Sequence, residues 1–214
     1  AQNAVGDTAA GNIWDNFDTR VTGAATLSES QAGNNIMHYT LPSLVDDLTV
    51  AVSYTPAGAN DESSSAFGLT YAGVEGLSVS YGQGSADGDA AGSGGTAANS
   101  DTTSLKASYA IGSFTLAYSD HDHDSNTDTS DQTASSWKVS YTVSDAVSVT
   151  YGTESLDSAA TADTSDAEYT KITASHTSGG MTVSANYQEA TEMSYTTAVD
   201  EDEEYYGLSL SFAF

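Results

Sequence analysis

The last stretch of the sequence reads Glu204-Tyr205-Tyr206-Gly207-Leu208-Ser209-Leu210-Ser211-Phe212-Ala213-Phe214. Every second residue of this stretch is large and apolar, namely Tyr206, Leu208, Leu210, Phe212 and Phe214. The residues between them are mostly small or polar. Alternate side chains of a β-strand point to opposite faces of a sheet. Chain ends usually fray unless secondary structure holds them, so the apolar face that continues to Phe214 predicts a strand built into a sheet.

The same alternation recurs through most of the chain. It predicts about eleven strands of ordinary length, at 34–41, 48–55, 64–72, 76–84, 102–111, 113–120, 135–143, 146–154, 168–177, 181–189 and 204–214. Residues 1–33 show neither a strand period nor a helix period. We therefore predict an irregular segment over 1–33, β-structure over 34–214, and no helix that could hold a catalytic residue.

The connections between the predicted strands alternate between tight and long. The long ones are 56–63, 85–101, 121–134, 155–167 and 190–203, and they carry most of the carboxylates. A β-sandwich also alternates apolar and polar residues, but it has connections of mixed length at both ends. Short turns on one side and long loops on the other are typical of an up-and-down barrel in an outer membrane.

Tyrosines mark both ends of the apolar face. One row stands at the long-loop ends of the strands, with Tyr54, Tyr81, Tyr118, Tyr151 and Tyr187; the other stands near the tight turns, with Tyr71, Tyr109 and Tyr141. Two such rows around an apolar band are typical of the two interfaces of a membrane. The opposite face is mostly Ser, Thr, Ala and Gly, which suits water better than a dry core. We therefore predict an all-β, antiparallel transmembrane barrel whose apolar face contacts lipid.

The composition excludes some partners and sites. The 214 residues hold 30 Asp and Glu against 4 Lys and Arg, for a formal charge of -26. Such a chain would repel the phosphates of nucleic acid. It has no Cys, so it forms no disulfide or thiolate metal site. No apolar run approaches the roughly 18 residues that a membrane helix needs.

Two stretches resemble bacterial general porins, particularly the alphaproteobacterial type. Residues 33–43 (GNNIMHYTLPS) look like the start of the strand that follows the constriction loop, and residues 48–56 are similar to the next strand. The resemblance implies a sixteen-stranded, homotrimeric channel in the outer membrane of a Gram-negative bacterium, which passes small hydrophilic solutes. It also implies that Phe212 and Phe214 form the assembly signal. Residues 1–33 would be the remainder of the inward-folded constriction loop, and the first five strands would be absent from the chain. The alternative is a complete barrel of about twelve strands, with 18–26 supplying one more.

A diffusion channel needs fixed charges at its narrow zone rather than catalytic groups. Lys106, Lys138 and Lys171 fall on the polar face of three predicted strands that run in the same direction. We expect them on one wall of the channel, with opposing charge from Asp15 and Asp18, and with Arg20, in the irregular segment. The alternative is that these lysines only avoid lipid, where a charge costs roughly 2–4 kcal/mol.

The remaining chemistry in the sequence is weaker. Asp120, Asp122 and Asp124 alternate with His121 and His123, and the stretch echoes a calcium loop, but Ser125 replaces the turn glycine. A solvated loop is the simpler interpretation. Loop carboxylates could together hold Ca²⁺ or Mg²⁺ that bridges lipopolysaccharide phosphates. A secreted or cell-surface calcium-binding β-protein, a solenoid or adhesin, is the alternative function. No Gly-x-Ser-x-Gly motif is present, so we predict no enzymatic activity and no cofactor.

Overall fold

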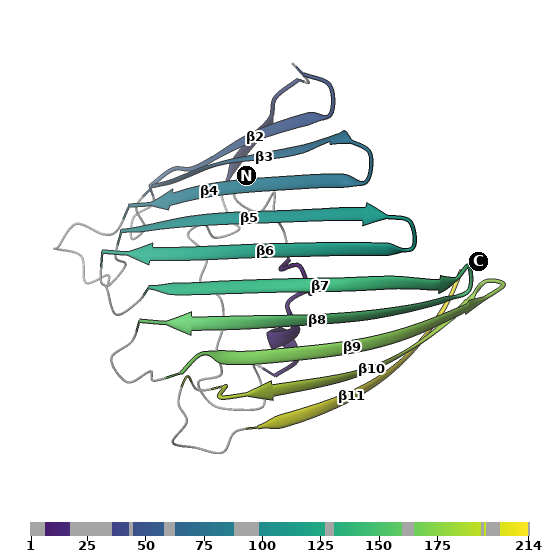
Figure 1. Ribbon diagram of the computed structural model, residues 1–214. Helices are drawn as coiled ribbons and strands as arrows, with labels where there is room; N and C mark the ends of the chain where they lie inside the picture. Colours follow the sequence, from purple (N-terminus) through teal and green to yellow (C-terminus); the bar gives the residue numbers. More distant parts are fainter. Residues whose placement is uncertain are drawn as a thin grey trace.

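The computed structural model describes residues 7–17, 36–42, 45–57, 63–87, 99–126, 131–159, 165–193, 195 and 202–213. These residues form one short 3₁₀ helix, η2 (Ile13–Asn16), and eleven strands (Figure 1). The strands are β1 (Met37–Thr40), β2 (Leu48–Thr55), β3 (Ser64–Val74), β4 (Leu77–Ala86), β5 (Ser100–Ile111), β6 (Phe114–Ser125), β7 (Gln132–Ser144), β8 (Val147–Ser158), β9 (Ala167–Ser178), β10 (Met181–Thr191) and β11 (Glu203–Phe212). Among the described residues, no helix has the length and apolar character needed to cross a membrane.

All eleven strands form a single sheet in which each strand pairs with its neighbours in the sequence, from β1 to β11. Every pair is antiparallel. The all-β, up-and-down prediction is therefore confirmed, and a two-sheet sandwich or a solenoid is excluded. Within the described residues the sheet is open, since β1 and β11 each pair with one neighbour. The proposed extra strand at 18–26 lies outside the described residues.

Strands β4 to β11 extend further toward the long connections than the alternation predicts. β6 continues to Ser125, where Ser125 pairs with Ser100 and Asp124 with Asp101, and β8 continues to Ser158. The prediction that 121–125 belong to a loop is wrong. Polar residues at these ends resemble a loop in sequence, but the backbone ladder continues through them because each strand has a partner of similar length.

The tight turns lie along one end of the sheet, as Figure 1 shows for the turns that follow β3, β5 and β7. Two residues, Gly112 and Ser113, connect β5 to β6, and two glycines connect β9 to β10. Gly112 and Gly179 have φ values of 57° and 61°. Two-residue hairpins need such left-handed backbone, which glycine adopts without a steric cost.

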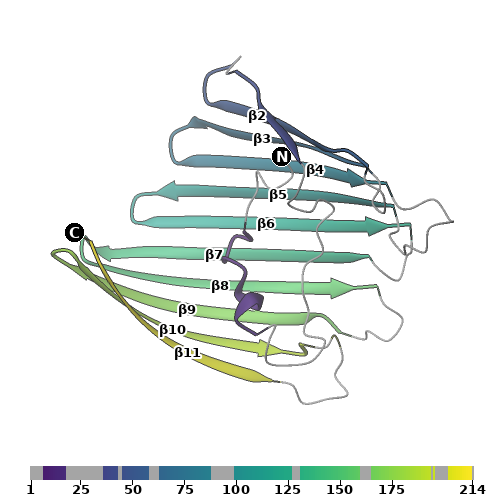
Figure 2. The ribbon, with the colours of Figure 1, turned by 180° about the vertical axis from the view of Figure 1, so that it is seen from behind.

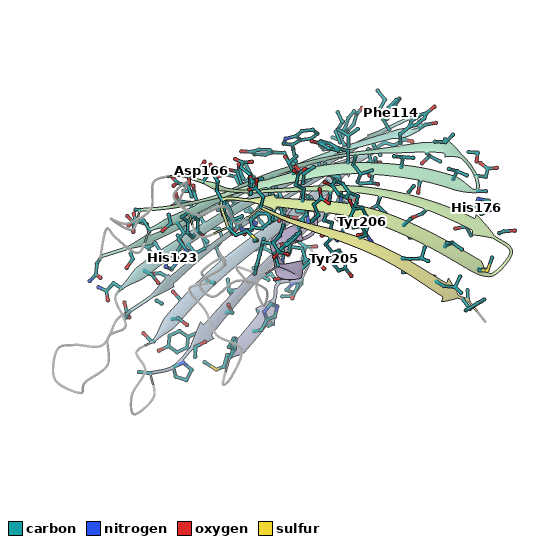
Figure 3. The ribbon with its side chains drawn as sticks, turned by 90° about the horizontal axis from the view of Figure 1, so that it is seen from below. Phe114, His123, Asp166, His176, Tyr205 and Tyr206 are labelled. Atoms are coloured by element: carbon teal, nitrogen blue, oxygen red, sulfur yellow. The ribbon has the colours of Figure 1, made fainter. Side chains whose placement is uncertain are left out.

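The two faces of the sheet differ as the sequence predicts. The outer face carries the apolar band, in which Leu116 is 48% exposed and Phe212 is 55% exposed. The inner face carries the intervening Ser, Thr, Ala and Gly residues. Figure 3 shows the sheet arching over residues 7–17, with Tyr205 of β11 beside η2. The only cluster of buried apolar side chains in the described residues lies on this inner side.

Candidate functional site at the inner face

Residues 7–17 form an inward segment that crosses the inner face of the sheet (Figure 2). Its polar half, residues 7–12, follows one row of paired residues on four successive strands: Lys106 pairs with Ser119, Ser119 with Ser136, and Ser136 with Glu154. We call these four residues the anchor row. All four side chains bond to the inward segment, so the register of β5 to β8 determines where the segment lies.

The two serines of the anchor row accept hydrogen bonds from the backbone. Ala9 N donates to Ser119 Oγ at 2.8 Å, and Ala10 N donates to Ser136 Oγ at 2.9 Å. Lys106 Nζ donates to the carbonyl oxygen of Asp7 at 2.6 Å. Backbone groups that lie away from water need partners, and here strand side chains supply them.

Glu154 accepts two hydrogen bonds from the inward segment, more than the other residues of the anchor row. Its side chain is 1% exposed. One carboxylate oxygen accepts a hydrogen bond from the Thr8 hydroxyl, and the other accepts one from Trp14 N at 3.3 Å. Thr8 Oγ1 also accepts bonds from the backbone N of Asn12 at 2.9 Å and of Gly11 at 3.2 Å. Glu154 therefore holds both the tight turn at 8–12 and the start of η2.

A glycine allows the inward segment to approach the wall. Gly152 lies on β8, two residues before Glu154, and a Cβ placed there would lie 2.8 Å from Ala10 Cβ. Such a distance is shorter than real side chains allow. Further along, Asn16 Nδ2 donates to Gln188 Oε1 of β10 at 3.0 Å. The segment thus reaches the inner face from β5 to β10.

The second half of the inward segment packs against the sheet mainly through apolar side chains. Ile13 and Phe17 are buried in one cluster with inner-face residues of the long-loop end of the sheet, namely Ala134, Leu156, Ala167, Tyr169 and Ala190. The Phe17 and Tyr169 rings lie 5.8 Å apart. Met193 and Tyr195, which follow β10, complete the cluster. This part of the inner face is therefore apolar and buried, whereas the rest is polar.

The three lysines predicted to line the channel all lie on the inner face. Lys138 and Lys171 both pair with Gly152, so they stand on either side of the place where Ala10 approaches the wall. Lys106 lies in the adjacent anchor row, and it is near enough to Lys138 for their charges to repel each other. Lys171 lies near the Glu154 carboxylate and attracts it. The structure thus brings the lysines together, and their effect on permeation stays a prediction.

Of the charged residues predicted on the inward segment, Asp15 is exposed in the first turn of η2. Asp18 and Arg20 lie outside the described residues. Asp7, which the sequence did not single out, is also exposed, and its carbonyl oxygen holds Lys106.

The predicted tyrosine rows lie on the outer face. Cross-strand pairs place Tyr187 opposite Ile172 and Tyr206, and Tyr141 opposite Phe114 and Val149. The hydroxyls at the long-loop end reach carboxylates: Tyr118 donates to Asp120 at 3.1 Å, and Tyr187 donates to Glu204 at 3.2 Å. Tyrosines thus form the border between the apolar band and an acidic rim. Phe212 lies on the outer face, and Phe214 lies outside the described residues.

The candidate calcium stretch is strand, and its side chains diverge. Asp120, Asp122 and Asp124 are exposed on the outer face. His121 and His123 point to the inner face, where Nδ1 of His121 lies 2.8 Å from Ser104 Oγ and Nδ1 of His123 lies 3.0 Å from Thr102 Oγ1. Across the described part of the chain, no group of three or more His, Cys, Asp or Glu residues could hold a metal ion.

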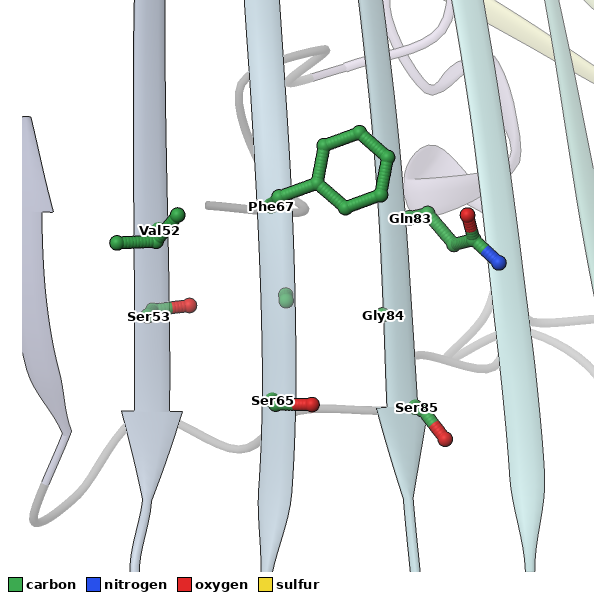
Figure 4. Close-up of a pocket in the computed structure, with 8 residues that line it drawn as sticks. Val52, Ser53, Ser65, Phe67, Gln83, Gly84 and Ser85 are labelled. Atoms are coloured by element: carbon green, nitrogen blue, oxygen red, sulfur yellow. The ribbon is translucent and has the colours of Figure 1, made fainter. Parts of the chain in front are cut away.

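A shallow hollow crosses β2, β3 and β4 (Figure 4). It forms where Ser53, Ala66 and Gly84 leave little side-chain volume beside Val52 and Phe67. It carries no charged group, and it lies away from the inward segment. We assign it no chemical role.

The sequence predictions missed the anchor residues Ser119, Ser136, Glu154 and Gln188. One signal for Glu154 was present. Among the carboxylates inside the predicted strands, it alone falls on the polar face, while Asp120, Glu168, Glu189 and Glu204 share the face of the tyrosines. The serines had no such signal, because serine is common at every inner position.

Comparison with known proteins agrees with this geometry. A family model described as Gram-negative porin matches residues 1–178. A search of curated proteins found no match.

Several solved structures share the fold. A porin refined at 1.8 Å matches with a TM-score of 0.63 and 18% identity, over 84% of this chain and 61% of that porin. An anion-selective porin from Comamonas acidovorans matches with a TM-score of 0.59 and 18% identity, over 74% of this chain and 49% of that porin. OmpT of Vibrio cholerae, an outer membrane protein solved in a trimer form, matches with a TM-score of 0.56 and 15% identity, over 89% of this chain and 72% of that protein. This chain therefore spans about half to three quarters of their lengths.

Proposed function

Since the chain belongs to the Gram-negative porin family, we propose that it forms the wall of a water-filled outer-membrane channel through which small hydrophilic solutes and ions diffuse passively. The observation that carries this proposal is the contrast between an exposed apolar outer face and a polar inner face that holds an inward segment. A barrel with this arrangement presents apolar residues to lipid and polar residues to water. The calcium-binding alternative finds no support in the family match.

The inward segment is the proposed constriction. It lies across β5 to β10 and carries Asp7 and Asp15 exposed, while Lys106, Lys138 and Lys171 stand on the wall behind and beside it. The acidic and basic groups lie close together on this side of the channel, and their charges would impose a local field that acts on a passing ion without a chemical step. We propose no enzymatic activity.

The proposed partners follow from the outer face. The apolar band would contact lipid, and the acidic rim beyond the tyrosines would meet lipopolysaccharide, with divalent cations between the two sets of negative charges. A homotrimer is the proposed assembly, supported by the trimer form of the Vibrio cholerae protein. In a closed barrel, the free edges of β1 and β11 would each pair with a further strand.

Planar bilayer recording tests the channel. The purified protein, refolded in detergent, should migrate differently on a gel before and after boiling and should give discrete conductance steps. Removal of divalent cations with a chelator should leave the steps intact. A protein that stays soluble without detergent, gives no steps, and unfolds on addition of chelator would contradict the proposal and favour the calcium-binding alternative.

A further inference from the structure

A second element folds toward the inner face, at the turn that follows β10. In this turn, Met193 is fully buried and Tyr195 is 8% exposed. Both belong to the cluster that holds Ile13 and Phe17 of the inward segment against Leu156 and its neighbours on the wall. The connection after β10 is one of the long acidic loops in the sequence, so complete burial of its methionine is unexpected.

The backbone conformation of this turn places Met193 in the cluster. Glu192 and Tyr195 have positive φ values, 54° and 56°, which residues with a side chain rarely adopt. Tyr195 N donates to Glu192 O at 2.8 Å and closes the turn. Ser165 N, just before β9, donates to Tyr195 O at 3.2 Å and ties the turn to the neighbouring connection. Unfavourable backbone at two positions persists only when the surroundings stabilise it.

Beneath the turn, the inner face of the sheet carries apolar side chains that must be shielded from water. Leu156, Tyr169 and Ala167 are apolar residues on the inner face, where the channel would expose them to water. Ile13 and Phe17 cover them from one side. The polar half of the inward segment is held by hydrogen bonds to the anchor row, and in the second half Asn16 donates to Gln188 of β10. The apolar side chains of this half, Ile13 and Phe17, are held by packing within the buried cluster.

We propose that the turn at Glu192–Tyr195 is a second inward element, and that Met193 is a positioning residue that fixes the width of the channel by holding η2 against the wall. This inference rests on the proposed channel function. Its consequence is that two segments far apart in the sequence, rather than the inward segment alone, determine the bore.

The test compares Met193→Ala with Met193→Leu, which keeps the volume, and with Met37→Ala, which removes a methionine that is 64% exposed on β1. Each protein is recorded in planar bilayers, for open-channel current noise and for the largest polyethylene glycol that enters. Met193→Ala should raise the noise at least two-fold and admit larger polymers. Met193→Leu and Met37→Ala should match the parent protein.

The outcomes separate the two proposals. A parent protein that gives no conductance contradicts the channel function itself. A conducting Met193→Ala protein with the noise and the polymer cut-off of the parent overturns the role of Met193.

If Met193→Ala does not assemble, oxidation of assembled channels replaces it. Chloramine-T converts methionine to its polar sulfoxide, which disrupts apolar clusters. Parent channels should become noisy as the peptide containing Met193 gains oxygen, and Met193→Leu channels should stay quiet. The inference would be overturned if Met193 became sulfoxide without a change in current noise. It would also be overturned if Met193 were oxidised as fast in the folded protein as in the unfolded protein.

Discussion

The outer and inner faces of the sheet differ in what their side chains contact. On the outer face, apolar residues repeat along the strands, and the proposed contact with lipid requires only that they be apolar. On the inner face, each anchor has a particular partner: Ser119 holds Ala9, Ser136 holds Ala10, and Glu154 holds Thr8 and Trp14. The outer face therefore requires only a class of residue, whereas the inner face requires particular residues that bond to the inward segment.

The largest expected effect comes from a charge on the outer face. Leu116→Arg should destabilise the membrane-inserted protein by about 2–4 kcal/mol, because lipid cannot solvate the guanidinium. Thr115→Arg, one residue earlier and facing inward, is the matched control and should cost much less. Urea unfolding in lipid vesicles measures both. Equal losses for the two variants would mean that the assignment of the faces is wrong.

On the inner face, the largest effect should come from Glu154→Ala. The Thr8 hydroxyl and Trp14 N would lose their acceptor at a buried site, which costs about 1–3 kcal/mol. In a Trp137→Phe background, Trp14 is the single tryptophan, and its quenching by acrylamide should increase. Glu168→Ala, on the outer face of the next strand, should leave quenching unchanged. Unchanged quenching in Glu154→Ala would contradict the anchoring role.

A smaller effect is expected where the inward segment approaches the wall. Gly152→Ala should destabilise by about 1 kcal/mol, since its new methyl group would lie too close to Ala10. The second substitution Ala10→Gly removes the opposing methyl group and should restore stability in the double variant. Urea unfolding of the two single variants and the double variant measures this coupling. If the effects simply add, the two residues do not touch.

The smallest effect on stability should come from Lys138→Gln, within about 0.5 kcal/mol. Its ammonium has no hydrogen bond to the described part of the chain, and relief of repulsion with Lys106 offsets the lost charge. The reversal potential in a salt gradient should shift toward cations, and more at 0.1 M than at 1 M salt, because the Debye length falls from about 10 Å to about 3 Å. A shift that is independent of salt, or no shift, would remove Lys138 from the permeation path.

The sequence predicted the outer face well, because the two-residue period separates the apolar outer face from the polar inner face directly. Tyr118, Leu116 and Val149 lie where the alternation placed them. The ends of strands were predicted too short, since residues such as Asp122 and Ser125 have weak strand preferences that pairing across the sheet overrides.

The inner site was only partly predictable. Lysine on the polar face was a visible signal, and all three lysines lie on the inner face. The anchor row was not visible, because it depends on the register among four successive strands and on an inward segment that is distant from them in sequence. Met193 was hidden for a similar reason, since only the tertiary fold shows that a residue of an acidic loop returns to the cluster.

The anchor row also has a consequence for biogenesis. Its residues come from four separate strands, so the inward segment finds all its hydrogen-bond partners only when every one of those strands is aligned correctly. A slip of one residue turns every side chain of a strand to the opposite face. A misaligned sheet would therefore leave residues 7–17 without these partners, so that the position of the segment depends on correct pairing of all four strands.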